Sequence, residues 1–466
     1  MPSLPCSVSQ SATSRRRGQY HAPSASEWSS DHQTRRSENE ALVRVLRAAS
    51  VRLRRTYYGW WIAFTGGFNA LLTSGPTFQG SSAIFTAVEA EFGWSRALVS
   101  GVASFGRVGG ALLGPLEGYF ADKVGPGRIT FIGLVVGGLG FIMFSRVQDP
   151  WSYYGAYIVL ATGFSFGGFT PSVVAVNSWM KHRRATGISI VLAGSSLGGV
   201  LVPALAWGIT AHGWRTTSLG IGILSIAVAP IFYLILSRKP PAEQLAPRPR
   251  RGVARTDPNR PDFTAREALR TRAFWLISLS HTFANFSTAA VSAHVILHLT
   301  DIGLSLGQAS TVVPVFALIG FAFQIVGGLV GDRFDKRLLA AVFLAIQTLG
   351  MVALAFAVNY VTAMLFAVLW GIGFGGRTPM LHAIRGDYFG TKAFGTILGL
   401  SSLTMAVGMT ATPVLVGLAF DIQGTYRWAF LFVSAACGIG SVLILFATRP
   451  VHPTQRARPV EEPTSP

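Results

Sequence analysis

Charged residues are scarce in this sequence. Asp, Glu, Lys and Arg together make up 13% of its 466 residues, against about 25% in an ordinary soluble domain. A soluble chain of this length would form roughly two or three domains, each of which needs a charged surface. The hydrophobic share of 50% leaves too few charges for such surfaces and also excludes a disordered protein. We therefore expect a polytopic membrane protein and not a soluble enzyme.

Cysteine is nearly absent as well. The two residues, Cys6 and Cys437, lie far apart in a polar tail and in an apolar stretch, which excludes a disulfide-stabilised scaffold. No group of His and Cys has the spacing of a metal site, so we expect neither a metal nor a cofactor. Residues 1–56 are rich in Ser and Arg and lack the apolar core of a signal peptide. We expect a disordered cytoplasmic tail, with a basic amphipathic helix over 38–55 as the alternative.

Apolar sequence is abundant, in stretches long enough to cross a bilayer as helices. Twelve such stretches lie at about 57–84, 97–120, 128–146, 151–175, 186–209, 216–236, 273–299, 309–331, 338–357, 360–384, 394–420 and 427–447. A polar stretch at 237–272, rich in proline and arginine, divides them into two groups of six. This pattern predicts two six-helix bundles at 57–236 and 273–447, joined by a cytoplasmic linker and followed by a tail at 448–466.

The net charge of +19 would suit a nucleic-acid binder, but the positions of the basic residues argue otherwise. Of the 39 Lys and Arg residues, 33 lie in the tails, the linker and the loops on one side of the predicted membrane, and four lie on the other. Basic residues mark the cytoplasmic side. We therefore expect both termini in the cytoplasm, a location in the plasma (inner) membrane, contact with membrane lipid and no binding of nucleic acid.

The two groups of stretches resemble each other in sequence. Gly118–Lys123 (GYFADK) follows the second stretch, and Gly328–Arg333 (GLVGDR) follows the eighth, 210 residues later. Phe166–Pro171 (FGGFTP) likewise matches Phe374–Pro379 (FGGRTP), 208 residues later. A parallel repeat of six plus six helices is typical of transporters that bind substrate between their halves near the middle of the membrane.

On these residues the chain resembles the major facilitator superfamily. The loop Gly118–Arg128 is similar to the conserved cytoplasmic loop of that superfamily, and Gly327–Arg337 is its second copy. Further motifs resemble the monocarboxylate porter and oxalate/formate antiporter group: Tyr58–Trp61, Phe92–Ser95, Asn177–Arg184, Gly194–Gly199 and Asp387–Gly390. The resemblance implies an all-α membrane protein with twelve transmembrane helices in two pseudo-symmetric six-helix bundles, working by alternating access.

The chain differs from this group at spans in which members of the group have charged residues. Monocarboxylate porters have an Asp and an Arg in the eighth span, and oxalate/formate antiporters have an Arg there and a Lys in the eleventh. Here the stretch 309–331 has no charge before Asp332, and 394–420 has none. The substrate chemistry of those families therefore does not transfer to these positions.

Two arginines lie inside predicted spans, Arg107 in the second and Arg377 in the tenth. A charge at the bilayer centre costs at least about 2.5–3.5 kcal/mol and usually faces a cavity or a partner. A guanidinium stays protonated and grips a carboxylate with two hydrogen bonds. We predict that one or both bind an anionic substrate; the alternative is that Arg107 pairs with Glu117 or with backbone carbonyls.

Three polar residues at matching depths in the first and seventh spans are further candidates for substrate binding: Asn69, His281 and Asn285. By family resemblance these two spans line the cavity. The alternative is hydrogen bonding between helices, which is common in membranes. His281 could also carry a coupled proton. Glu117 is the other candidate carrier, although an ion-pair partner at a helix end is the more common use of such a carboxylate.

The repeated loops predict a gate on the cytoplasmic side. Each has an Asp at a helix end together with basic residues, which can pair with one another and with neighbouring helix ends in one state and separate in the other. The predicted gating residues are Gly118, Asp122, Lys123 and Arg128 in the first copy and Gly328, Asp332, Arg333 and Arg337 in the second.

These observations predict a secondary transporter of a small organic anion, a monocarboxylate or dicarboxylate, moved by proton symport or anion exchange. The expected partners are the anionic substrate and a coupled proton, and we expect a monomer. Drug or metabolite efflux is the alternative within transport, and a transport-inactive sensor or receptor is the alternative of another class. We expect no enzymatic activity, because the hydrolase-like pattern Gly194–Gly198 (GSSLG) lies in an apolar stretch without an Asp and His pair.

Overall fold

The computed structural model describes residues 57–240 and 261–456. The predicted N-terminal tail, the middle of the linker and the end of the C-terminal tail lie outside the described residues. Within the described helices some side chains are also left out, including those of residues 103–108 and hence that of Arg107. Everything that follows concerns the described residues.

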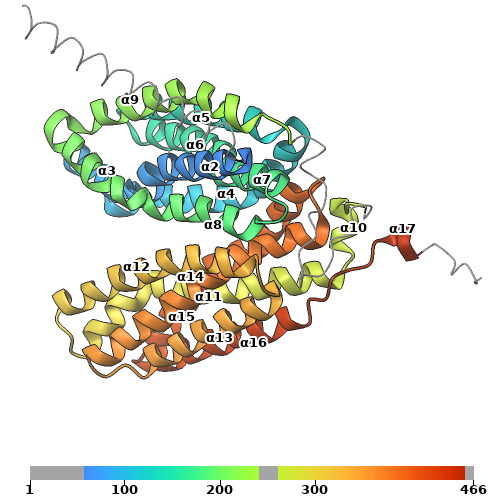
Figure 1. Ribbon diagram of the computed structural model, residues 1–466. Helices are drawn as coiled ribbons and strands as arrows, with labels where there is room; N and C mark the ends of the chain where they lie inside the picture. Colours follow the sequence, from blue (N-terminus) through green and yellow to red (C-terminus); the bar gives the residue numbers. More distant parts are fainter. Residues whose placement is uncertain (1–56, 241–260, 457–466) are drawn as a thin grey trace, which may run out of the picture. The chain divides into compact units, whose positions relative to one another are not determined.

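The described first half of the chain consists of helices joined by short non-helical connections (Figure 1). Its elements are α2 (Tyr58–Ser74), the π-helix η1 (Gly75–Gln79), α3 (Ser81–Phe92), α4 (Arg96–Val124), α5 (Pro126–Phe144), α6 (Pro150–Gly167), α7 (Phe169–Trp179), α8 (Arg184–Leu197), the 3-10 helix η2 (Gly198–Leu201) and α9 (Val202–Leu236). Each of the first six predicted apolar stretches is thus helical.

The second half repeats this arrangement with fewer interruptions (Figure 1). Its elements are α10 (Ala265–Leu269), α11 (Arg272–Asp301), α12 (Leu306–Gly331), α13 (Lys336–Ala355), α14 (Tyr360–Phe389), α15 (Phe394–Gln423), α16 (Arg427–Leu445) and α17 (Pro453–Arg456). The last six predicted stretches correspond to α11–α16.

Eight helical stretches in the described part are long and apolar enough to cross a membrane. One of them, Arg184–Leu236, holds two predicted spans, and α2, α4 and α11 coincide with the remaining ones. Their outward faces expose large apolar side chains, among them Leu112, Trp207, Leu234, Leu318 and Val407. In water such a surface would drive aggregation, whereas a bilayer solvates it.

Corresponding helices of the two halves begin with the same cap. The Asp149 side chain accepts hydrogen bonds from the backbone at the start of α6, and the Ser152 hydroxyl in turn accepts one from the backbone N–H of Asp149. Asn359 and Thr362 form the same capping box at the start of α14. Such a cap satisfies backbone N–H groups that have no partner within the helix. The shared cap is a local expression of the sequence repeat.

Three details of the helices differ from the predicted ranges. The span predicted at 151–175 is broken at Gly168, between α6 and α7. The spans predicted at 186–209 and 216–236 are joined through α9, which bends at Gly213, where φ is 79° and favours glycine. The range 360–384 ends five residues too early, because α14 continues to Phe389. This last correction moves Arg385 from a predicted loop into a helix.

Close contact between the halves is confined to particular helix pairs, chiefly α4 with α15 and α8 with α12. At Gly118 of α4 a Cβ atom would overlap the backbone carbonyl of Gly395 at the start of α15. Gly114 lies one turn before Gly118 on α4, and a Cβ atom at Gly399 of α15 would overlap the backbone of Gly114. Glycine therefore lets these two helices meet backbone to backbone, as small residues do at helix contacts in membranes.

Candidate functional site

Helix α14 carries two of the most deeply buried side chains of the described part. Arg377 has none of its surface exposed and Arg385 only 1%. They lie eight residues apart, about 12 Å along a helix. Arg377 is also about 18 Å before the end of α14 at Phe389, near the middle of the predicted membrane. Burial on this scale requires that the guanidinium groups find partners.

The partners of Arg377 are all neutral oxygens. Its Nε donates to Oε1 of Gln347 at 2.6 Å, and its Nη2 donates to Oδ1 of Asn285 and Oγ1 of Thr288, both at 3.3 Å. The guanidinium also lies over the Phe374 ring, 5.4 Å from its centroid. The atom Nη1 is buried and has no hydrogen-bond partner. Arg377 and the predicted site residue Asn285 are therefore in direct contact.

Arg385 makes a second set of neutral contacts nearer the end of α14. Its Nη2 donates to Oγ of Ser401 at 2.6 Å and to Nδ1 of His281 at 3.5 Å, and its Nη1 donates to the carbonyl of Leu381. Its Nε is buried without a partner. Since arginine only donates, Nδ1 of His281 carries its lone pair here. The predicted site residue His281 is thus tied to an arginine that was assigned to a loop from the sequence.

A second histidine completes this group. The ring of His382 on α14 meets the ring of His281 edge to face, with centroids 5.2 Å apart. On its other side it meets Phe169 of α7, 5.6 Å away, which belongs to the first half of the chain. The His382 side chain is 7% exposed, and its Nδ1 has no partner. The group therefore reaches the junction between the two halves.

The polar residues of α11 form one face of that helix. They recur at the three- and four-residue spacing that places side chains on one side of a helix. They are Ser278, His281, Thr282, Asn285 and Thr288. All five bond to other helices: Ser278 to Ser401, His281 to Arg385, Thr282 to Thr404, and both Asn285 and Thr288 to Arg377. This spacing is the sequence signal that could have identified the whole face and not only His281 and Asn285.

The buried charge of this group is positive and is not neutralised by a carboxylate. No ion pair in the described part joins Arg377 or Arg385 to Asp or Glu. The buried carboxylate of the first half, Glu117 on α4, instead accepts hydrogen bonds from Ser165 and from Thr170, the latter at 3.1 Å. An unpaired buried charge is costly, so two such guanidiniums form an environment suited to an anion.

The remaining predicted binding residues lie in the first half. Asn69 is fully buried, and its amide donates to the carbonyls of Gly167 and Gly168, at 2.7 and 3.1 Å, and to Ser172. These bonds satisfy carbonyls that the break between α6 and α7 leaves free. Arg107 lies on α4, but its side chain lies outside the described residues. The structure does not bring Asn69 into the group on α14.

The predicted gating aspartates reach across to the opposite half. Asp122 accepts from the backbone N–H groups of Gly395 and Thr396, at 2.9 and 2.7 Å, at the start of α15. Asp332 accepts from the backbone of Ala185 and Thr186, both at 2.9 Å, at the start of α8. Thr396 and Thr186 add hydroxyl bonds at 2.8 and 2.6 Å. The two contacts are copies related by the repeat, and each joins a carboxylate to a helix N-terminus.

Burial dominates the titration of these two carboxyls, which lie beyond the predicted spans. Burial raises the pKa of Asp122 to about 6, although the hydrogen bonds from Thr396 and Gly395 lower it in part. Burial also raises the pKa of Asp332, against the bonds from Thr186 and the nearby charge of Lys336. Both groups therefore hold a proton more readily in this contact than they would in water.

The basic residues of the predicted gate do not pair with these aspartates. Lys123 donates to the Tyr119 hydroxyl at 2.9 Å, and Arg337 pairs with Asp335 of its own loop at 2.9 Å. Arg128 and Arg333 are exposed.

A different ion pair joins the halves. Arg184, just before Ala185, contacts Asp387 of α14 at 2.6 Å, and Lys336 contacts the same carboxylate at 2.8 Å. With the register of the FGGFTP and FGGRTP match, Asp387 corresponds to Trp179, so only one copy of the contact is ionic.

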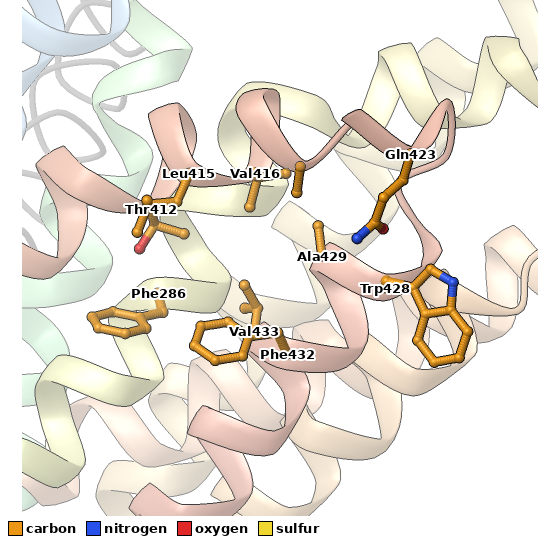
Figure 2. A pocket seen from close by; sticks show the side chains of 10 residues that line it. Phe286, Thr412, Leu415, Val416, Gln423, Trp428, Ala429, Phe432 and Val433 are labelled. Atoms are coloured by element: carbon orange, nitrogen blue, oxygen red, sulfur yellow. The ribbon is translucent and has the colours of Figure 1, made fainter. Parts of the chain in front are cut away.

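An apolar pocket lies elsewhere in the second half, between α11, α15 and α16 (Figure 2). Phe286, Thr412 and Phe432 line one part of it, and Gln423 and Trp428 lie at the other (Figure 2). No charged side chain lines this pocket, and neither buried arginine reaches it. It does not have the chemistry of an anion site.

Comparison with known families gives a match over most of the chain. The family model described as Major Facilitator Superfamily matches residues 62–320 and 278–466. Monocarboxylate transporter 13 of Rattus norvegicus is 22% identical over 397 residues, which cover 83% of this chain and 88% of that protein. The Gallate transporter of Pseudomonas putida is 26% identical over 377 residues, which cover 70% of this chain and 82% of that protein.

Among solved structures, the E. coli fucose:proton symporter FucP has a TM-score of 0.64 at 13% identity. The match covers 84% of this chain and 100% of that chain. At this identity the likeness shows the fold alone. It confirms the predicted fold class, twelve transmembrane helices in two pseudo-symmetric six-helix bundles.

Proposed function

The chain belongs to the major facilitator superfamily and is an integral membrane protein that acts as a secondary transporter, and we propose that it carries a small organic anion, a monocarboxylate or dicarboxylate, by alternating access. In this proposal it acts in the plasma membrane with both termini in the cytoplasm. Transport proceeds by proton symport or by anion exchange. The relatives named Monocarboxylate transporter 13 and Gallate transporter support a carboxylate as the substrate class.

One observation carries this proposal: Arg377 and Arg385 are buried on one helix with only neutral partners among the described residues. Each keeps one nitrogen without a hydrogen-bond partner. A carboxylate would supply both the missing acceptor and the missing negative charge. We assign Arg377 as the anchor of the carboxylate, Asn285 as the residue that orients it, and Arg385 as a second positive group along the path.

The aspartate contacts support the alternating-access part of the proposal. Asp122 and Asp332 each hold a helix of the opposite half at the end where the repeated loops lie. In the proposed orientation this end is cytoplasmic, so the described arrangement is closed to the cytoplasm. Release of both contacts would open that side, while the reciprocal opening on the outer side would close.

The test is uptake by proteoliposomes that contain the full chain. Pyruvate, benzoate, gallate and succinate would be supplied as radiolabelled probes, with and without an inward pH gradient and with unlabelled anion inside. We expect saturable uptake of at least one probe. Arg377→Gln should lower it by about 10- to 100-fold, because a charge-assisted hydrogen bond contributes about 1.5–3 kcal/mol. Full uptake by Arg377→Gln would contradict the anchor role.

Drug or metabolite efflux is the second candidate, and the apolar, aromatic pocket of Figure 2 is the observation that favours it. Efflux predicts transport of apolar compounds that tolerates Arg377→Gln but responds to changes at Phe286 or Phe432. A sensor or receptor would bind an anion in solution and give no flux in the same proteoliposomes.

A further inference from the structure

The buried histidines His281 and His382 have no part in gripping the substrate as proposed above. They lie on different helices, α11 and α14, with their rings edge to face at 5.2 Å. His281 accepts from Arg385 through Nδ1, and Nδ1 of His382 has no hydrogen-bond partner although the side chain is 7% exposed. A buried imidazole nitrogen with a free lone pair is a potential proton acceptor.

The groups that face the pair are positive or neutral. Arg377 and Arg385 of α14 are the charged side chains that act on both histidines. Helix α15 contributes Ser401, through its bond to Arg385, and α7 contributes the Phe169 ring. Within residues 57–240 and 261–456, no carboxylate is among the groups acting on the pair. A proton added to either histidine would therefore be a third positive charge in an unneutralised site.

We propose that His281 and His382 are the proton-binding pair of this transporter, and that the pair takes up a proton when a carboxylate binds at Arg377 and Arg385. This inference rests on the proposed anion site. In the step, His382 starts as the neutral tautomer that carries its hydrogen on Nε2, and a proton from solvent adds to the lone pair of Nδ1 and forms an imidazolium. No covalent bond other than that N–H forms, and the same N–H breaks when the proton is released with the anion.

The coupling follows from charge balance in a site of low dielectric. Without an anion, two guanidiniums repel an incoming proton, because like charges interact strongly away from water. A bound carboxylate carries one negative charge, and this charge attracts the positive charge of the protonated histidine pair. By linkage, the proton must in turn strengthen binding of the anion by the same factor. The substrate would then enter and leave together with a proton.

The position of His382 would allow its proton to exchange with the solution on one side of the membrane and then with that on the other. Its ring contacts Phe169 of α7, across the junction of the halves. Separation of the halves at this end, where Asp122 and Asp332 now bind, would remove that cover. The stretches 309–331 and 394–420 of this chain contain no titratable side chain. The histidine pair supplies such groups on α11 and α14.

The experiment counts the protons taken up for each anion bound. Purified full chain in detergent is titrated with benzoate and with gallate by calorimetry, at pH 6 and 7, in two buffers of different ionisation heat. We expect uptake of about one proton per anion, as one titrating pair requires. His382→Gln and His281→Gln should lower that number several-fold, while the affinity for the anion falls by less than about tenfold. His294→Gln is the matched control, because His294 on α11 bonds the carbonyl of Pro413 outside the pair.

The outcomes separate this inference from the proposed function. Binding of benzoate or gallate without proton uptake by the unmodified chain would overturn the histidine pair and leave the anion site standing. Full proton uptake by the double variant His281→Gln/His382→Gln would do the same, and the melting temperature of each variant shows whether it is folded. Absence of binding by both probes, with Arg377→Gln indistinguishable from the unmodified chain, would overturn the anion site and the inference with it.

Discussion

The two halves of the chain share a repeat of 210 residues but bury opposite charges. The described first half buries a carboxylate, Glu117, which is held by the hydroxyls of Ser165 and Thr170. The second half buries two guanidiniums, with neutral partners and unpartnered nitrogens. The repeat aligns Arg377 with Phe169, so this difference arose on a shared framework. In the proposed mechanism the symmetric features would serve the movement of the halves, and the asymmetric ones would serve binding of the anion.

The contacts that join the halves show the same division. The bonds of Asp122 and Asp332 to opposite helix starts are equivalent copies. The ion pair between Arg184 and Asp387 exists in one copy only. The glycine contacts also differ, because Gly118 meets backbone whereas Gly328 meets the Ser189 side chain. Four predictions test whether these differences have consequences.

The largest expected effect concerns the buried charges. Arg377→Gln should weaken binding of the transported anion by about 10- to 100-fold, because it removes a charge-assisted hydrogen bond. Glu117→Gln should change the same dissociation constant by less than about threefold, since its carboxylate is already satisfied by hydroxyl groups. Calorimetric titration of both variants measures the contrast. Equal losses of affinity in the two variants would mean that the buried charges of the two halves contribute equally to anion binding.

The next effect concerns the two glycines of the repeated loop. Gly118→Ala should lower uptake by about tenfold, because overpacking against the fixed Gly395 backbone disfavours the closed arrangement by about 1–3 kcal/mol. Gly328→Ala should have a smaller effect that Ser189→Gly partly rescues, since much of the obstruction there is a side chain. Gly109→Ala is the control, because a Cβ there meets nothing within 4 Å. Rescue of Gly118→Ala by Ser189→Gly would contradict this distinction.

An effect of similar size, on the accessibility of one position and not on uptake, is expected from the aspartates. Asp122→Ala or Asp332→Ala should each raise the rate at which a cysteine at Val174→Cys reacts with a maleimide by about 5- to 30-fold, since each contact is worth about 1–2 kcal/mol. Val174 is buried beside Gly395 in the closed arrangement. Because the two contacts are copies, the two variants should behave alike. Lys123→Gln, at a residue that bonds only its own helix, should leave the rate unchanged.

The smallest effect is a dependence on pH. The pKa of Asp122 is raised to about 6 in the closed contact, whereas an exposed Asp titrates near 3.9. Because the carboxyl of Asp122 binds a proton more tightly in the closed state, protonation stabilises that state. This stabilisation is complete at pH below about 4 and is lost as the pH rises through about 6. Labelling of Val174→Cys, taken relative to the labelling of an exposed cysteine at the same pH because the thiolate is the reacting form, should therefore slow as the pH falls from 7.5 to 5. Asp122→Asn/Asp332→Asn should remove most of that dependence, and an unchanged slope in this variant would refute the assignment.

Much of the fold could be predicted because membrane helices leave a strong local signal. A run of about 20 apolar residues predicts a span without knowledge of its neighbours, and each of the twelve predicted ranges is helical. The short motif that contains Gly118 and Asp122 predicted a contact at this end of α4, and both residues do meet the start of α15. The scarcity of charge in the spans likewise drew attention to Arg377 before any contact was known.

The members of the α14 group were less accessible to prediction. The sequence predicts a loop at Arg385, because the apolar run ends before the helix does. His382 gave no signal, since nothing in its local sequence shows that it meets Phe169 from the other half. The partners of Asp122 are backbone groups at Gly395 and Thr396, which any residue type could supply. Contacts of this kind carry no sequence signature.

The sequence by itself determined that the chain lies in a lipid bilayer, how many spans it has, that it contains a repeat and that buried charge is rare. Each of these depends on composition and on distances along the chain. Only the tertiary structure decided which groups meet. It joined Arg377 to Asn285, Arg385 to His281, and the repeated aspartates to helices of the opposite half. The physical reason is that a guanidinium or carboxylate can satisfy its hydrogen bonds in many ways, and the packing of distant helices selects one of them.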